Sequence, residues 1–111
     1  MFFEKEINEL VNSISKTNEF KEFKKAKANI NKYPDLKEEL EDFQKKQIDL
    51  YNMNMRGEKN DWLTSDLNRS FKKLSKFPEI HKLLSSGKEF NDMMFKLYKT
   101  INDLLNSQFE K

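Results

Sequence analysis

The sequence contains no cysteine, only two glycines, two prolines and a single histidine in 111 residues. Without cysteine, the chain has no disulfide, no thiolate nucleophile and no cysteine ligand for zinc or an iron–sulfur cluster. So few glycines and prolines leave little of the turn chemistry that hairpins between strands require. These absences exclude several kinds of cofactor site and favour a few long helices.

The chain is also poor in apolar residues, because apolar and charged residues each make up 36% of it and its mean hydropathy is −0.94. Such a composition is typical of disorder unless the apolar residues recur periodically. Here 10 Phe, 3 Tyr and 1 Trp recur at helical spacing and indicate folding. We therefore predict an all-α fold and, from the chain length, a single domain over residues 1–111.

Apolar periodicity and helix-end signals predict five helices. Thr17 is a suitable N-cap for the second helix, and Gly57 is a suitable end for the third. We expect a five-helix bundle of antiparallel helical hairpins with a long C-terminal helix. In chain order, the predicted helices run from about 3 to 15, from Thr17 to before Pro34, from Pro34 to Gly57, from Asn60 or Asp61 to Leu74, and from Pro78 to about Ser107.

A short motif of lysine, aromatic, proline, acid and aliphatic residue occurs twice, beginning at Lys32 and at Lys76. Proline has no N–H to lose at the first helical position, and it disfavours a helical conformation for the residue before it. The motif therefore predicts a joint where one helix ends and the next begins. We expect Tyr33 and Phe77 to pack inside their joints, and Asp35 and Glu79 to face the positive ends of the new helices.

The predicted last helix is apolar over a wide arc, and three short, highly charged helices cannot cover it. This pattern predicts a homodimer. Met53, Met55, Met93 and Met94 could form an adaptable partner groove, with core packing as the alternative. The polar seam residues Gln47, Asn54 and Asn91 are interpreted as wet edge positions or as hydrogen bonds that set the register of an interface. The interface candidates are Met53, Met55, Phe90, Met94, Leu97, Tyr98, Ile101 and Leu105.

The residues give little support to catalysis. His81 has no carboxylate three or four positions later, so we interpret it as a surface or joint residue rather than a general base. The acids Glu38, Glu39, Glu41 and Asp42 spread around a helix and are interpreted as a solvated face rather than a metal site. A glycine-rich phosphate loop is absent. We expect no enzyme activity, no cofactor, no metal and no small-molecule substrate.

Two segments without acidic residues, FKKAKANINKYP and NRSFKKLSKFP, are locally basic, although the formal net charge of the chain is only +2. Phosphate contacts from such groups would be independent of base sequence and sensitive to salt. No recognition motif with stacking aromatics accompanies them, so solvated helix faces are the favoured interpretation and RNA binding is the alternative. The possible RNA contacts are Lys24, Lys25, Lys72 and Lys73.

Four segments in order, TNEFKEFKKA, YPDLKEELEDFQKKQIDL, NMNMRGE and EIHKLL, resemble the YlbF/YmcA family of small helical bacterial proteins. The resemblance spans nearly the whole chain. It is carried by Phe20 after an acidic helix start, by Phe43 with Gln47, and by Ile80 in the last helix. The lack of cysteine departs from family members credited with iron–sulfur clusters, and it favours the YheA-like branch of uncharacterised members.

This resemblance implies regulation rather than catalysis. Family members are associated with competence, sporulation and biofilm development, and some act as adaptors that influence messenger-RNA processing by an endoribonuclease. No catalytic residue carries over. The N-terminal stretch MFFEKEINEL contains acids and no long apolar run, so we expect no secretory signal, no membrane insertion and a cytoplasmic location. The predicted function is a non-catalytic regulatory adaptor, with a weak RNA-binding accessory protein as the alternative.

Overall fold

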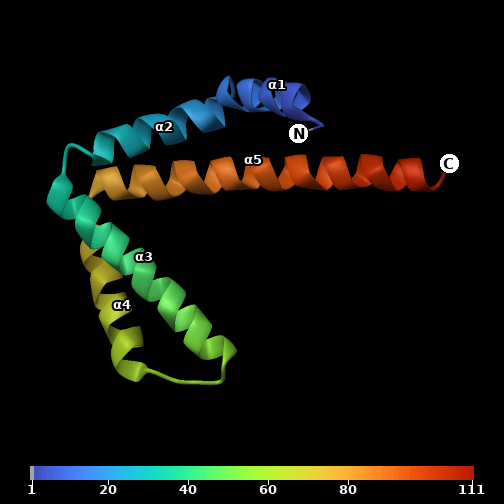
Figure 1. Cartoon of the computed structure of the whole chain (residues 1–111). Coiled ribbons are helices and arrows are strands. Elements are labelled where there is room, and N and C mark those ends of the chain that lie inside the picture. The colour runs from blue at the N-terminus through green and yellow to red at the C-terminus, as the bar shows by residue number, and fades with distance from the viewer. Residues whose placement is uncertain (1) are drawn as a thin grey trace. The chain divides into compact units, whose positions relative to one another are not determined.

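The computed structural model describes residues 2–111, which form five helices and no strand (Figure 1). The predicted all-α class and the long C-terminal helix are confirmed, since the last helix has 32 residues. The helices are α1 (Glu4–Ser15), α2 (Asn18–Ile30), α3 (Pro34–Met55), α4 (Asp61–Leu74) and α5 (Pro78–Phe109).

The predicted helix ends follow from local chemistry. The Thr17 hydroxyl accepts a hydrogen bond of 3.2 Å from the backbone N–H of Phe20, and so caps α2. The Asn60 side chain accepts one of 2.9 Å from the N–H of Leu63 and caps α4 in the same way. Gly57 has a φ of 78°, the left-handed conformation that ends a helix at low cost in glycine. These three predictions are confirmed.

The chain forms two compact units. Unit 1 contains the residues up to Ala26 together with Leu83–Lys111, and unit 2 contains Lys27–Lys82. Unit 1 therefore holds α1, most of α2 and most of α5, whereas unit 2 holds α3, α4 and the helix ends that flank them. The single domain over residues 1–111 stays a prediction.

In unit 2, α3 and α4 lie side by side (Figure 1). The Phe43 and Phe71 ring centroids are 6.4 Å apart. Lys46 contacts Asp66, and Lys73 contacts Glu39. Along α3, the residues Glu39, Phe43 and Lys46 contact residues that come progressively earlier in α4. The two helices therefore run antiparallel. The buried apolar side chains of this unit are Ile30, Leu36, Leu40, Phe43, Leu63, Leu67, Leu74 and Ile80.

In unit 1, α2 packs on α5 through aromatic rings. The Phe90 ring centroid lies 6.1 Å from that of Phe20 and 5.6 Å from that of Phe23. Gly87, one turn before Phe90, allows this approach, since a Cβ atom built on it would lie 3.1 Å from Cε1 of Phe23. The glycine therefore provides space for the Phe23 ring rather than a special backbone conformation.

We expect Gly87→Leu to lower the free energy of unfolding by about 1–3 kcal/mol, because overpacking forces neighbouring groups out of position. Gly87→Ala should have a much smaller effect, since the gain in helix propensity of about 1 kcal/mol opposes the crowding. Urea titration followed by circular dichroism measures both changes.

The Phe23→Ala background provides the control for this prediction. Removing the ring leaves space next to position 87, so Gly87→Leu should there cost less or stabilise the protein. An equal loss in both backgrounds would mean that Gly87 is needed for a reason other than the Phe23 ring.

Candidate protein-interaction surface

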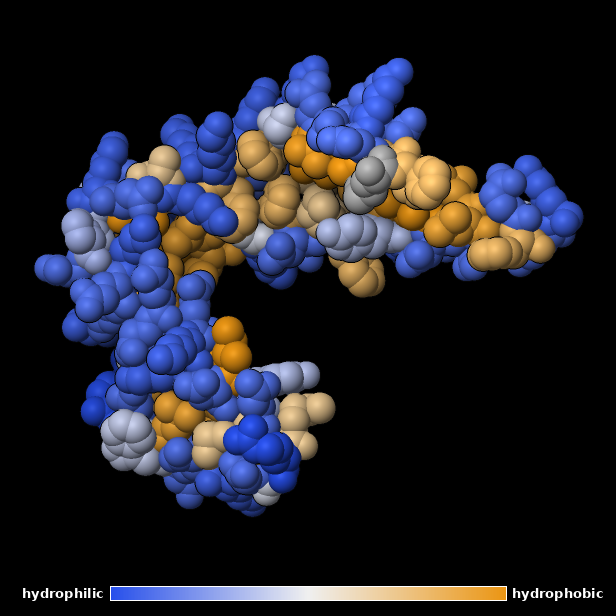
Figure 2. All heavy atoms as spheres, in the orientation of Figure 1, coloured by the Kyte–Doolittle hydropathy of each residue, from blue (hydrophilic) through white to orange (hydrophobic). Residues whose placement is uncertain are grey.

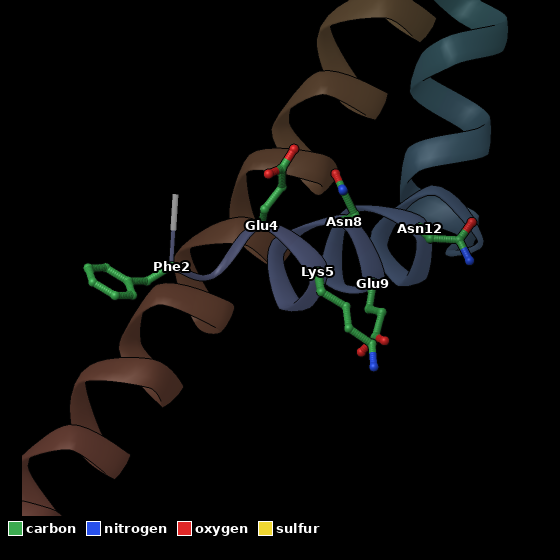
Figure 3. A pocket seen from close by; sticks show the side chains of 6 residues that line it. All are labelled: Phe2, Glu4, Lys5, Asn8, Glu9 and Asn12. Atoms are coloured by element: carbon green, nitrogen blue, oxygen red, sulfur yellow. The ribbon is translucent and has the colours of Figure 1, made fainter.

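An exposed apolar surface covers α1 and the C-terminal half of α5, both in unit 1. We call it the α1/α5 apolar surface. Figures 1 and 3 both show α1 beside α5, and Figure 2 shows apolar side chains gathered along these two helices. The surface comprises Ile7, Leu10 and Val11 of α1 with Tyr98, Ile101, Leu104, Leu105 and Phe109 of α5.

The sequence of α1 is amphipathic, yet the helix has no buried residue. Ile7 and Leu10 are each 38% exposed, and Val11 is 57% exposed. An apolar stripe of this kind normally faces a core. Contiguous exposed apolar patches on proteins commonly mark sites where another protein binds. The α1 stripe therefore extends the surface that α5 presents.

The structure divides the α5 interface candidates into two groups. Tyr98, Ile101 and Leu105 are exposed, which leaves them accessible to a partner. Phe90, Met94 and Leu97 are only half-buried, and the Phe90 ring already packs against α2. The second group is therefore less accessible to a partner than the first.

The candidates Met53 and Met55 belong to unit 2 rather than unit 1. Met55, the last residue of α3, is 72% exposed, and Met53 is half-buried. Gln47 and Asn54 line a shallow groove between α3 and α4, with Tyr51 and Phe71 among its other lining residues. The end of α3 thus presents a second, smaller apolar feature.

The four candidate RNA-contacting lysines are all exposed. Lys24 and Lys25 lie in unit 1, and Lys72 and Lys73 lie in unit 2. Lys73 is not a free cation, because its Nζ atom lies 3.1 Å from Oε1 of Glu39. One of the four charges is therefore balanced within the protein.

Lys46 links α3 to α4 electrostatically. Its ammonium donates a hydrogen bond of 2.8 Å to Asp66 and lies 3.0 Å from Asp42. The hydrogen bond from Lys46 is the main cause that lowers the pKa of Asp66. The pKa of Lys46 is raised mainly by its hydrogen bond to Asp66 and, to a smaller extent, by its hydrogen bond to Asp42. The folded state thus favours the charged form of both partners.

We expect Asp66→Asn to reduce the acid sensitivity of folding. An aspartate whose pKa is lowered by folding contributes stability above its unfolded value of about 3.9, and loses it as pH falls through the lower folded value. The unmodified protein should therefore lose more stability than the variant between pH 5 and pH 3, as urea titrations at each pH would show. Asp103→Asn, which removes an exposed i,i+4 pair with Lys99, is the control, and a change as large as that of Asp66→Asn would contradict the prediction.

The surface also has open polar depressions. Phe2, Glu4, Lys5, Asn8, Glu9 and Asn12 line the one in Figure 3, where Lys5 and Glu9 extend to one side of α1 and Glu4 and Asn8 extend to the other. The acids Glu38, Glu39, Glu41 and Asp42 line another open depression. No group of three or more His, Asp or Glu side chains among residues 2–111 is arranged to hold a metal ion.

His81 Nε2 lies 2.5 Å from the carbonyl oxygen of Ser75, next to the second joint.

The surface features define an all-helical protein whose main accessible feature is an apolar face. In the described part of the chain, none of the helices is both long enough and apolar enough to span a membrane. Over residues 3–106 the chain matches the family described as control of competence regulator ComK, YlbF/YmcA, and it belongs to this family. The family resemblance seen in the sequence is confirmed, and the family is a regulatory one.

Two similar proteins are both named UPF0342 protein. One is from Caldicellulosiruptor saccharolyticus and is 32% identical over 105 residues, covering 92% of this chain and 86% of its own. The other is from Caldicellulosiruptor bescii and is 32% identical over 105 residues, covering 92% of this chain and 87% of its own. No solved structure matches the chain.

Sequence reasoning missed the part of the surface formed by Ile7, Leu10 and Val11, together with Leu104 and Phe109 of α5. The periodicity of α1 was a signal, but it predicts only an apolar face and not what covers that face. The structure adds α1 to the surface because this helix has no buried residue.

Proposed function

We propose that the protein is a non-catalytic, cytoplasmic regulatory adaptor that forms a homodimer through the α1/α5 apolar surface. The observation that carries this proposal is the exposed apolar face on two neighbouring helices of unit 1. The regulatory character of the family agrees with it. Because the family match runs from residue 3 to 106, we further propose that both units work together as one domain.

A second copy suits this surface because a two-fold interface places the same apolar patch on both sides. Tyr98, Ile101 and Leu105 lie at spacings of three and four residues, which gives one stripe along α5. Such a stripe can pack against an identical stripe by coiled-coil-like contacts. The homodimer would thus cover apolar side chains that a single chain leaves in water.

The adaptor role requires a further surface that remains accessible in the dimer. Met55 at the end of α3 is a candidate, because it is largely exposed and lies in the other unit. Methionine side chains adapt to partners of different shape. The proposed partners are other regulatory proteins or an endoribonuclease, with effects on developmental control or messenger-RNA processing.

We expect Met53→Gln combined with Met55→Gln to abolish capture of partner proteins from the native cell, because apolar anchors supply most of the affinity of such contacts. The measurement is an affinity pull-down with mass spectrometry. The matched control is the quadruple change of Lys24, Lys25, Lys72 and Lys73 to Gln, which should leave capture intact. Loss of capture in the control alone would contradict the proposal.

Weak RNA binding remains the second candidate function because Lys24, Lys25 and Lys72 are exposed and form no ion pair among the described residues. We expect single-stranded RNA to bind no more tightly than about 10 µM at physiological salt, which is the range of nonspecific contacts. Sub-micromolar binding that disappears in the quadruple variant would favour RNA binding over the adaptor role.

A further inference from the structure

The two copies of the lysine–aromatic–proline motif, 44 residues apart in the sequence, meet at one groove of unit 2. We call it the joint groove. It has a volume of about 460 Å³, within the range of about 300–1,000 Å³ that ligand pockets occupy. Its apolar lining is Tyr33, Pro34, Leu36 and Phe77. Its charged lining is Lys32, Asp35, Glu39 and Glu79.

Backbone hydrogen bonds hold the start of the new helix at each of the two joints. The carbonyl oxygen of Tyr33 accepts a hydrogen bond of 2.9 Å from the N–H of Lys37. The carbonyl oxygen of Phe77 accepts bonds of 3.1 and 3.2 Å from the N–H groups of Ile80 and His81. Pro34 and Pro78 start the next helices. None of these contacts involves an aromatic ring.

Both aromatic rings are nevertheless held partly in solvent. Tyr33 is 44% exposed and Phe77 is 39% exposed, although the sequence predicts that both pack inside their joints. The neighbouring aliphatic residues Leu36 and Ile80 are 9% and 1% exposed, so it is these residues that fill the core. The rings therefore line the groove, where a ligand can contact them.

The charge of the groove selects the kind of ligand. Three carboxylates and one ammonium line it, although the chain as a whole carries a formal net charge of +2. Glu39 is paired with Lys73 at 3.1 Å, whereas Asp35 and Glu79 form no ion pair among the described residues. Their positions in the first turns of α3 and α5 favour a negative charge through the helix dipoles. The groove thus combines aromatic rings with carboxylate groups.

We propose that the joint groove binds an arginine side chain of a partner protein. The guanidinium stacks on aromatic rings and forms paired hydrogen bonds with carboxylates, and its aliphatic stem contacts apolar side chains. An anionic ligand would be repelled, and a purely apolar one would leave carboxylates without water or a partner. Lysine would match the charge but lacks the planar group that stacks.

This proposal does not use the α1/α5 apolar surface, so the dimer and the groove can be tested separately. The experiment is an NMR titration of the ¹⁵N-labelled full chain with the blocked tripeptide Ala-Arg-Ala at low salt. A single side chain binds weakly, so we expect saturable shifts with a dissociation constant in the millimolar range, confined to residues 32–39 and 77–79.

The matched control is the same tripeptide with citrulline, which has nearly the shape of arginine but no charge. We expect citrulline to bind roughly tenfold more weakly, because both the ion pairs and the cation–π contact are lost. Equal affinity of the two peptides would overturn the proposal. Equal affinity of a lysine peptide would overturn the choice of arginine.

The positions of the shifts on the unmodified chain distinguish binding in the groove from nonspecific attraction of the peptide to acidic residues. Glu38, Glu41 and Asp42 lie in α3 outside the groove, and shifts centred on them would show nonspecific attraction and overturn the proposal. In Tyr33→Leu combined with Phe77→Leu, the preference for arginine over citrulline should fall at least threefold. Because the peptide comparison on the unmodified chain stands alone, the proposal stays testable if this variant does not fold.

Discussion

Replacing Tyr98 and Leu105 with glutamate should raise the dissociation constant of the proposed dimer by at least about 100-fold. Each substitution places a charge in an apolar interface, where desolvation without a partner costs several kcal/mol, and about 1.4 kcal/mol corresponds to a factor of ten. The two positions are 57% and 51% exposed in the protomer, so the same charges should leave its fold intact. Sedimentation velocity over a range of concentrations measures the change, and circular dichroism checks the fold.

The matched control changes Thr100 and Ser107 to glutamate. These residues are also seven positions apart on α5 and add the same charge, but they lie on the opposite side of the helix. We expect this variant to remain dimeric. Equal dissociation in both variants would show that net charge, rather than the apolar stripe, determines association.

The unmodified protein gives the most direct test of the dimer. An interface with this much exposed apolar side chain should keep the dimer assembled at about 10 µM. A monomer at that concentration would remove the basis of the proposed homodimer. It would leave the joint groove untouched, because the groove is lined by residues of unit 2.

The helices could be predicted from the sequence because helix ends depend on nearby residues. The Thr17 hydroxyl and the Asn60 amide each act three residues away, and Gly57 acts through its own backbone. Proline starts α3 and α5 by the same local rule. Signals of this kind need no knowledge of which helices meet.

Burial was harder to predict because it depends on contacts between distant segments. The period of α1 is as clear as that of α4, yet α4 buries Leu63, Leu67 and Leu74 and α1 buries nothing. Phe90 shows the opposite case, since the sequence places it on an exposed stripe and the structure packs its ring against α2. A helical period identifies an apolar face but not its partner.

The joint groove illustrates the same limit for a candidate site. The repeated motif predicts two joints, and in the structure α3 begins at Pro34 and α5 begins at Pro78. Nothing in the 44-residue spacing shows that Tyr33 and Phe77 line one groove, because that depends on how α3, α4 and the start of α5 pack. Sequence reasoning therefore found the parts of this site but not the site.

A comparison of two isoleucines in the same helix tests the distinction between core and surface. Ile80 is 1% exposed in unit 2, and Ile101 is 39% exposed in unit 1. Ile80→Ala should lower the free energy of unfolding by about 2–5 kcal/mol, because it removes buried methyl groups and leaves a cavity. That loss is a large part of the roughly 5–15 kcal/mol that stabilises a typical domain.

Ile101→Ala should instead cost less than about 1 kcal/mol when the protein is dilute enough to be monomeric, because exposed substitutions change stability little. At concentrations where the dimer forms, the difference in the free energy of unfolding between this variant and the unmodified protein should be larger, since dimerisation stabilises the folded state by mass action. Urea titrations at two protein concentrations measure both effects. A loss for Ile101→Ala that is as large as that for Ile80→Ala and independent of concentration would mean that Ile101 packs inside the protomer. The α1/α5 apolar surface would then lose its central residue.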